Sequence, residues 1–292
     1  MTDAGFAPAP DGLPPQISGL DRCVVVGVLN VTPDSFSDGG RWFAPDAAIA
    51  HGLELASQGA DLVDVGGEST RPGAQRVEVA EELARTVPVV RALAAHGVAV
   101  SIDTMRADVA HAAVEAGAVL VNDVSGGLAD PDMYGRVAAL DVPYVAMHWR
   151  GHSDRMADLA HYDDVVAEVV GELTERLTSA VGAGIDAARI VLDPGIGFAK
   201  NAEHNWTLLA HLDALRALGR PLMVGVSRKR FLGELLAGRD GVAPPPDERD
   251  LATSVLSSMC ARAGAWAVRV HDVRGACEAL AVADALEHGR VR

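Results

Sequence analysis

Residues 24–40, VVVGVLNVTPDSFSDGG, join an apolar run of strand type to a polar loop. The apolar run, 23–29, stops at Asn30, and the loop that follows is dense in Thr, Pro, Asp, Ser and Gly. A buried strand that delivers a carboxamide to its C-terminal end, followed by a polar loop, is how α/β enzymes build their sites. Phe36 is the large apolar residue in this loop and could form a wall for a planar ligand. The alternative is an ordinary turn with a packed phenylalanine.

The same unit, a short apolar run followed by a longer Ala-rich amphipathic stretch, repeats along the whole chain. The expected strands are 23–29, 62–65, 99–103, 119–123, 144–147, 190–192, 222–226 and 267–270. The expected helices are 45–58, 79–95, 106–116, 132–140, 163–183, 204–218, 249–263 and 274–287. Strict alternation of eight β–α units predicts an α/β fold, a closed parallel (β/α)8 TIM barrel in a single domain. The strands show little polar alternation, as expected when both faces of a sheet are buried.

Composition limits the class of protein further. With 292 residues and 49% apolar side chains, the chain can build one large barrel with a sizeable core. No apolar run approaches the roughly 18 residues of a membrane helix. The first 16 residues lack the basic and apolar regions of a secretion signal. Their Pro and Gly content predicts a disordered N-terminal arm over 1–20, before a barrel over 21–292.

The charge and the cysteines exclude several partners. A net charge of −15 argues against nucleic acid and against anionic membranes, which bind through Lys and Arg. The cysteines, Cys23, Cys260 and Cys277, form no C-x-x-C pattern and indicate no zinc site. Buried thiols in a reducing compartment predict a cytoplasmic protein.

Polar residues stand where nearly every expected strand ends. In order they are Asn30, Asp64, Asp103, Asn122, Met147 with His148, Asp193, 227–229, and 269–271. Asp, Asn and Lys are poor strand residues, so their regular placement at one end predicts an enzyme site at the barrel mouth. For Asp103 and Asp193 the alternative is a helix cap or a turn.

Seven blocks of this sequence resemble, in the same order, the motifs of the dihydropteroate synthases. Besides 24–40 they are DVGGESTRPGA (64–74), SIDT (101–104), NDVSGG (122–127), DPGIGFAK (193–200), GVSRKRFLG (225–233) and RVH (269–271). The resemblance implies a transferase of folate biosynthesis that acts on two small molecules. It would condense 6-hydroxymethyl-7,8-dihydropterin pyrophosphate with p-aminobenzoate through a new C–N bond and release pyrophosphate.

The resemblance also implies roles for the residues at the mouth. Asp193 would clamp the guanidine-like edge of the pterin, while Asp103 and Asn122 bond the rest of the ring. The other pterin contacts implied are Val124, Met147, Gly197, Phe198 and Lys229. The p-aminobenzoate site would comprise Phe36, Arg71, Pro72, Phe198 and Lys229. The residues expected to act in catalysis are Asp103, Asp193, Lys229, Arg269 and His271.

The leaving pyrophosphate implies a cofactor, Mg²⁺, together with cationic donors. Asn30 offers a hard carbonyl oxygen for the metal, and Arg269 offers a planar fork for phosphate oxygens. The pyrophosphate contacts implied are Asn30, Thr70, Arg71, Arg269 and His271. Asp38 lies in the first loop, which we expect to close over the substrates together with the segment 68–76.

Several features allow more than one interpretation. A pterin-dependent methyltransferase or a catalytically silent pterin-binding paralogue could share the pterin clamp. The first would not need the SRKR segment (227–230), and the second should have lost loop or anion-binding residues. Family members often carry a small hydroxyl residue where this chain has Arg230, which puts a benzoate contact at that position in doubt.

Two further expectations concern surfaces. His148, His152 and His161 could form a metal cluster, but their spacing fits no zinc pattern and favours surface histidines. The family is commonly dimeric, and the helices expected at 249–263 and 274–287 could form a homodimer face.

Overall fold

The computed structural model describes residues 8–32, 45–69, 76–152, 156 and 158–289. Eight parallel strands form one sheet in the order β6-β5-β4-β3-β2-β1-β8-β7. The strands are β1 (Val24–Asn30), β2 (Leu62–Gly66), β3 (Val100–Asp103), β4 (Leu120–Asp123), β5 (Tyr144–Met147), β6 (Ile190–Asp193), β7 (Met223–Val224) and β8 (Ala267–Val270). A bridge between Leu192 and Leu222 joins the two edges of the sheet, so the predicted barrel is confirmed.

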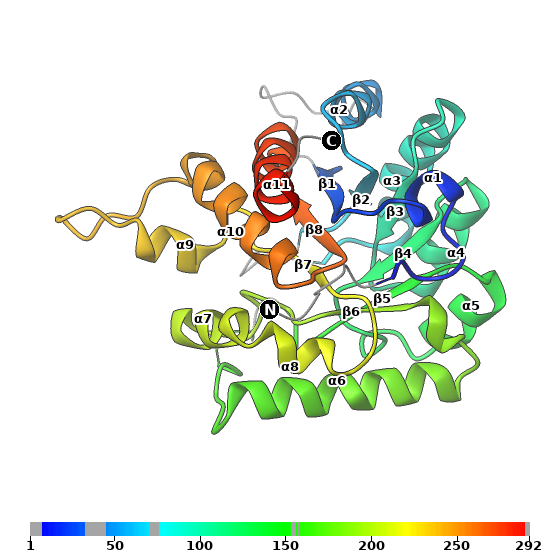
Figure 1. Ribbon diagram of the computed structural model, residues 1–292. Helices are drawn as coiled ribbons and strands as arrows, with labels where there is room; N and C mark the ends of the chain where they lie inside the picture. The colour runs from blue at the N-terminus through cyan, green and yellow to red at the C-terminus, as the bar shows by residue number, and fades with distance from the viewer. Residues whose placement is uncertain (1–7, 33–44, 70–75, 153–155, 157, 290–292) are drawn as a thin grey trace.

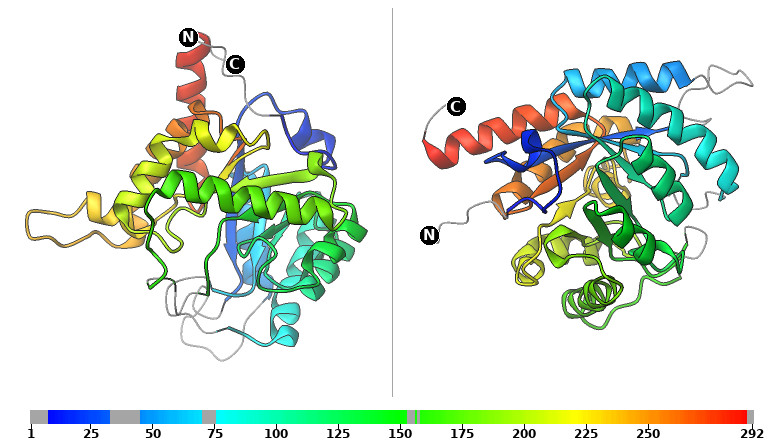
Figure 2. Two further views of the ribbon diagram at one scale, coloured as in Figure 1. Left: turned by 90° about the horizontal axis from the view of Figure 1, so that it is seen from below. Right: turned by 90° about the vertical axis from the view of Figure 1, so that its right-hand side faces the viewer.

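Helices surround the strands on the outside of the barrel (Figures 1 and 2). They are α2 (Pro45–Ser57), α3 (Val79–Ala95), α4 (Ala107–Glu115), α5 (Met133–Leu140), α6 (Val165–Gly182), α7 (Ala202–Ala210), α8 (Leu212–Arg216), α9 (Arg230–Leu235), α10 (Asp250–Arg262) and α11 (Val273–His288). Their apolar faces pack on the strands, and the strand side chains form a continuous buried core. Within the described residues, no helix is both long enough and apolar enough to cross a membrane.

Side chains and glycines fix the helix ends where the sequence predicts them. Asp164 caps α6 by accepting from the backbone N–H groups of Val166 and Ala167, both at 3.0 Å. Gly59 and Gly117 follow α2 and α4 with φ of 107° and 115°, a conformation that glycine adopts without strain. The barrel therefore follows the local chemistry of the sequence at these positions.

The N-terminal segment differs from the prediction of a disordered arm over 1–20. Residues 8–20 pack under the barrel and include a short helix, α1 (Pro15–Ser18). Leu13 and Ile17 are buried against Trp266 and the N-terminal ends of the strands. The strands open an apolar interior at that end, and covering it gains hydrophobic free energy. The prediction is wrong for residues 8–20, and residues 1–7 lie outside the described part.

Two other elements differ from the sequence expectation. The helix expected over 204–218 is divided into α7 and α8 at His211, whose backbone (φ −123°, ψ 38°) is not helical. The segment 225–235 contains an additional helix, α9, directly after Lys229. The Gly- and Pro-rich segment 236–248 is largely exposed and projects away from the barrel (Figure 1).

Candidate active site

Arg269 joins the ends of three strands at the C-terminal mouth of the barrel. Its Nε donates to Asp64 Oδ2 at 2.6 Å, and its Nη2 donates to Asp103 Oδ2 at 2.7 Å. Asp64 is fully buried and also accepts from Asn122 Nδ2 at 2.9 Å and from Ser101 Oγ at 2.5 Å. Asp64 thus orients both the cation and the carboxamide that the sequence places at the mouth.

The buried charges at this junction shift the pKa values of Asp103 and Arg269. Burial raises the pKa of Asp103 to about 7, although the Arg269 guanidinium opposes that shift. Burial alone would lower the pKa of Arg269, but the carboxylates of Asp64 and Asp103 hold it above its ordinary value. The junction therefore holds a permanent cation beside a carboxyl group that can gain a proton near neutral pH.

Asp193 lies at the end of β6 and begins a tight turn. Its Oδ1 accepts from the Gly195 backbone N–H at 2.7 Å, so the turn expected as an alternative role is present. Burial raises its pKa, and the ammonium of Lys229 opposes that shift. Asp103 makes no such local bond: the N-cap residue of α4 is Arg106, and no side chain caps that helix end. Asp103 is therefore not a helix cap, and Asp193 can serve both the turn and a ligand.

Lys229 reaches the same turn from the other side. Its ammonium donates to the backbone carbonyl of Ile196 and lies 4.8 Å from the centre of the Phe198 ring. Burial lowers the pKa of Lys229 to about 8, and the Asp193 carboxylate opposes that shift. Lys229, Phe198 and Asp193 are thus brought together as expected.

Apolar side chains complete the mouth. Val124, Met147 and Met105 form a small buried cluster, against which Phe198 and Trp149 pack. An adjoining small cleft, open to solvent, is lined by Glu68, Arg76, Glu82, Asp103, Thr104, Met105 and Val124. The sequence indicates three of these apolar walls, whereas Met105 and Trp149 were not expected.

The basic run 227–230 divides into separate roles. Ser227 Oγ lies 2.8 Å from His271 Nδ1 and accepts from the His271 backbone N–H at 3.1 Å. Arg228 makes two bonds of 2.7 Å to Asp250, away from the mouth. Arg230 is 83% exposed and pairs with Glu234, so its side chain lies in solvent on α9. Lys229 is the cation of this run that enters the site.

Comparison with known proteins agrees with this geometry. Residues 26–271 match the family model described as pterin binding enzyme. The dihydropteroate synthase of Mycobacterium leprae is 57% identical over 265 residues, covering 90% of this chain and 93% of that protein. The chain belongs to this family.

Solved structures of the family share the fold at high similarity. The structure of Xanthomonas albilineans dihydropteroate synthase with 4-aminobenzoic acid is 46% identical, with a TM-score of 0.86, and covers 96% of this chain and 98% of that one. The same enzyme in complex with 7,8-dihydropteroate has a TM-score of 0.82, 45% identity and coverage of 91% and 94%. These relatives favour a synthase over a methyltransferase or a silent paralogue. The protein is thus a transferase of folate biosynthesis that forms a C–N bond between a pterin and p-aminobenzoate.

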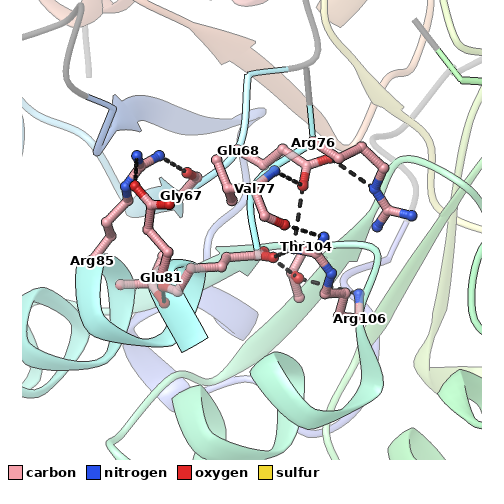
Figure 3. A network of polar contacts seen from close by, with 10 residues as sticks. Gly67, Glu68, Arg76, Val77, Glu81, Arg85, Thr104 and Arg106 are labelled. Carbon is pink, nitrogen blue, oxygen red and sulfur yellow. Dashed lines mark hydrogen bonds and ion pairs between the residues drawn. The ribbon is translucent and has the colours of Figure 1, made fainter. Parts of the chain in front are cut away.

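A polar network joins Glu68 to Arg76, Val77 and Arg106 in this synthase (Figure 3). The Glu68 carboxylate accepts from Arg76 Nε and from the Val77 backbone N–H, both at 3.3 Å. Arg106 lies 3.2 Å from the same carboxylate and also donates to the Val77 carbonyl. The sequence alone assigns no role to Glu68 or Arg106, which lie far apart in the chain. Glu68 and Arg76 therefore line the same cleft as Asp103.

A buried glutamate supports that network from α3. Glu82 is 1% exposed, accepts from Thr104 Oγ1 at 2.6 Å and bonds Arg106. Thr104 directly follows Asp103 at the end of β3. In the sequence, the buried role of Glu82 is indicated by its position on the apolar face of the helix expected at 79–95, because a buried acid is unusual unless it is paired.

The prediction of surface histidines is wrong for His148. It is 1% exposed, and its Nδ1 lies 2.9 Å from Lys200 Nζ. His152 instead contacts Trp149, and His161 is exposed. In the described ranges, no three His, Cys, Asp or Glu side chains are grouped to hold a metal. His148 directly continues β5, and the mouth of the barrel encloses it.

Some predicted site residues cannot be placed. Phe36, Asp38, Thr70, Arg71 and Pro72 lie outside the described residues. Asn30 ends β1 and is half-buried, and the next residue, Val31, donates its backbone N–H to the Gly66 carbonyl at 2.7 Å. The rim of β1 is therefore fixed where the first loop begins.

Proposed function

We propose that the dihydropterin binds between Asp103, Asn122 and Asp193, and that its diphosphate lies toward Asn30, Arg269 and His271. The observation that carries this assignment is the pairing of Arg269 with Asp64 and Asp103. This pairing places the cation proposed to bind the diphosphate next to a carboxylate proposed to bind the pterin, as expected because one methylene group links the two parts of the substrate. Gly197 belongs to the pterin side because its backbone lies against the Lys229 side chain.

The p-aminobenzoate site is proposed beside Phe198 and Lys229. The ring of Phe198 offers an apolar face, and the ammonium of Lys229 lies over it. A carboxylate ligand at this position is stabilised by that cation. Phe36, Arg71 and Pro72 are proposed to complete the site. The relative solved with 4-aminobenzoic acid supports a site of this kind.

Magnesium is proposed to bind at Asn30 together with the diphosphate. The carboxamide oxygen is a hard ligand, and no described cluster of acids competes with it for the metal. That sparse donor set suits Mg²⁺, which keeps several waters and commonly binds through substrate phosphates. When bound, the ion neutralises charge on the departing oxygens.

Electrostatic stabilisation accounts for the reaction. The bond between the pterin methylene carbon and the diphosphate oxygen breaks, and its electron pair leaves with the diphosphate. Arg269 and His271, with Thr70 and Arg71 of the second loop, stabilise that leaving charge. Asp103 and Asp193 favour the positive charge that develops on the pterin. The amine of p-aminobenzoate then forms the C–N bond and loses a proton to water.

A homodimer is proposed through α10 and α11. These helices pack side by side (Figure 1), and both carry exposed large apolar side chains. The residues are Leu251, Val255 and Met259 on α10, and Val282 and Leu286 on α11. Apolar stripes of this spacing commonly mark a subunit interface. A cytoplasmic location stays a prediction, consistent with the free thiols of Cys23, Cys260 and Cys277.

The proposal is tested with purified protein, dihydropterin pyrophosphate, p-aminobenzoate and Mg²⁺. Chromatography should detect dihydropteroate and an equal amount of pyrophosphate, and omission of the metal should abolish both. Undiminished product in the presence of a chelator would refute the metal assignment. Product formation that survives substitution of Asp103, Asp193 and Lys229 together would refute the proposed site.

A further inference from the structure

The chain has two lysines, Lys200 and Lys229, among its 25 basic residues, and all the others are arginine. Both ammonium groups bond the turn that follows β6. Lys229 donates to the carbonyl of Ile196 from outside the turn. Lys200 lies inside it and is 8% exposed. An arginine-rich chain thus carries a lysine at two places only, and both ammonium groups contact one turn.

The ammonium of Lys200 has three acceptors around it. They are His148 Nδ1 at 2.9 Å, the Gly195 carbonyl at 3.1 Å and the Phe198 carbonyl at 3.1 Å. An ammonium has three N–H groups, so every donor has a partner. Because His148 Nδ1 accepts, we assign the ring proton to Nε2, which lies 3.0 Å from Glu172 Oε2.

The turn itself needs such support. Gly195, Gly197 and Ala199 have φ of 64°, 81° and 48°, and the left-handed conformation is strained for alanine. Gly195 also packs so closely on the end of β5 that an added Cβ would lie 2.3 Å from the His148 carbonyl oxygen. A segment with this backbone keeps its shape only when surrounding groups hold it.

We propose that Lys200 is a positioning residue for the substrate pocket, because its ammonium fixes the turn that places Asp193, Phe198 and Lys229. The turn contacts each of these three residues. The Gly195 N–H donates to Asp193, the Ile196 carbonyl accepts from Lys229, and Phe198 is part of the turn, with its ring beside the Lys229 ammonium. This inference rests on the proposed function for the roles of those three residues.

The chemistry of lysine suits this position better than that of arginine. Three acceptors around one nitrogen match the tetrahedral ammonium, whereas the guanidinium presents its donors in one plane. A neutral apolar side chain would remove the ammonium donor from the Phe198 carbonyl and leave the Gly195 carbonyl with the Phe198 backbone N–H, from which it accepts at 3.0 Å. Burying a cation whose direct partners are all uncharged is unfavourable, so the contacts to the turn must offset that cost.

The test compares Lys200→Met with Arg220→Met. Arg220 also bonds a backbone carbonyl, that of Ala187 at 2.5 Å, but at the opposite end of the barrel. Lys200→Met should raise the Kd for the pterin and the KM for p-aminobenzoate, each by about tenfold or more, the loss expected for a bond to a charged group. Arg220→Met should leave both constants within about twofold, a change of less than 0.5 kcal/mol. Constants unchanged in Lys200→Met, or equally changed in both variants, would overturn the proposal.

A second readout needs no substrate. Hydrogen exchange of the backbone amides at 196–199 should become faster in ligand-free Lys200→Met and stay unchanged in Arg220→Met. Slow exchange in Lys200→Met would overturn the positioning role. If Asp193→Asn leaves pterin affinity unchanged, the proposed function fails, while the exchange result still reports on Lys200.

A third variant covers the case in which Lys200→Met does not fold. His148→Leu removes one of the three acceptors and keeps the ammonium and both carbonyl bonds. It should shift the same constants and the same amides in the same direction, but less. Wild-type constants and exchange in His148→Leu would overturn the proposal.

Discussion

Arg269 Nη2 donates to Asp103 Oδ2 across 2.7 Å, a bond that joins residues 166 positions apart in the chain. The same guanidinium holds Asp64, so one cation neutralises two buried carboxylates. An unpaired buried carboxylate is costly. Arg269 therefore stabilises the fold as well as the proposed anion site.

Substitution Arg269→Met should lower the free energy of unfolding by about 3–5 kcal/mol, the usual cost of breaking a buried pair. Arg22→Met is the matched control, because Arg22 makes a bidentate pair with Asp61 at the other end of the barrel and is 39% exposed. An exposed pair contributes about 1 kcal/mol or less. Urea unfolding measures the free energy of unfolding of both variants. Equal decreases in the two variants would show that the Arg269 pair is no more important for stability than an exposed pair. Pyrophosphate affinity, measured by calorimetry, should fall only in Arg269→Met.

Asp103 should make the stability of the ligand-free protein depend on pH. Burial raises its pKa from 3.8 to about 7, so between these values the folded state holds a proton that the unfolded state releases. Its contribution to stability is full below about 3.8 and is lost as pH rises through about 7. The charge of Arg269 lowers the pKa of Asp103, while the charges of Asp64, Glu82 and Asp123 raise it.

Asp103→Asn removes that titration and gives the measurement. The unfolding free energy of the wild type should fall relative to that of the variant from pH 4 to pH 7, as the wild type loses this contribution. A difference that stays constant over this range would show that Asp103 titrates at its ordinary value.

The two lysines allow a direct titration. Protein labelled with ¹³C at the lysine ε-carbons should give two NMR signals, assigned by Lys200→Met. Burial lowers the pKa of Lys200 to about 7, with Lys229 and Arg150 acting in the same direction and Asp193 and Glu172 opposing. The Lys200 signal should titrate near pH 7 and the Lys229 signal near pH 8. A midpoint near 10.5 for Lys200 would mean that its ammonium is solvated.

Asp193→Asn should weaken pterin binding about 10- to 150-fold, because a charge-assisted bond contributes roughly 1.5–3 kcal/mol. The asparagine oxygen can still accept from the Gly195 N–H, so the turn should persist. Asp186→Asn is the control, since Asp186 accepts from the Ala188 N–H in a similar turn outside the mouth. Calorimetry with a pterin distinguishes them. Equal affinities in the two variants would remove Asp193 from the pterin site.

The proposed dimer predicts that Val255→Glu dissociates the protein. Val255 is 51% exposed and lies between Leu251 and Met259 on α10, so a carboxylate there would be buried in the interface. Val181→Glu on α6 places the same charge on another exposed apolar residue, 42% exposed. Sedimentation should show a lower mass for the first variant and wild-type mass for the second. A wild type that sediments as a monomer would refute the interface.

Local patterns were sufficient for the architecture and for part of the site. The apolar runs and the amphipathic stretches predict the eight strands and their helices, because strand and helix periods are properties of neighbouring residues. Polar residues such as Asn122 and Asp193 stand at the C-terminal ends of strands, and Lys229 follows β7; parallel strands gather those ends at one mouth. The sequence therefore locates the mouth without knowledge of any contact.

Other predictions failed where burial depends on distant segments. His148 follows a strand within a polar stretch and reads as a surface histidine, yet Lys200 and Glu172 from later elements enclose it. The Pro-rich segment 8–20 reads as disordered, yet Ile17 finds the open end of the barrel. In both cases the partner lies far away in the chain.

The sequence by itself determined the barrel, the strand ends that carry polar residues and the family resemblance, since each is written in short contiguous segments. Tertiary structure alone decided that Arg269 pairs with Asp64 and Asp103, and that Lys200 holds the turn of Asp193. Such pairs form because closing the barrel brings strand ends together and removes water from them. Once buried, each charge requires a partner, and only the folded arrangement determines which residue is near enough to provide it.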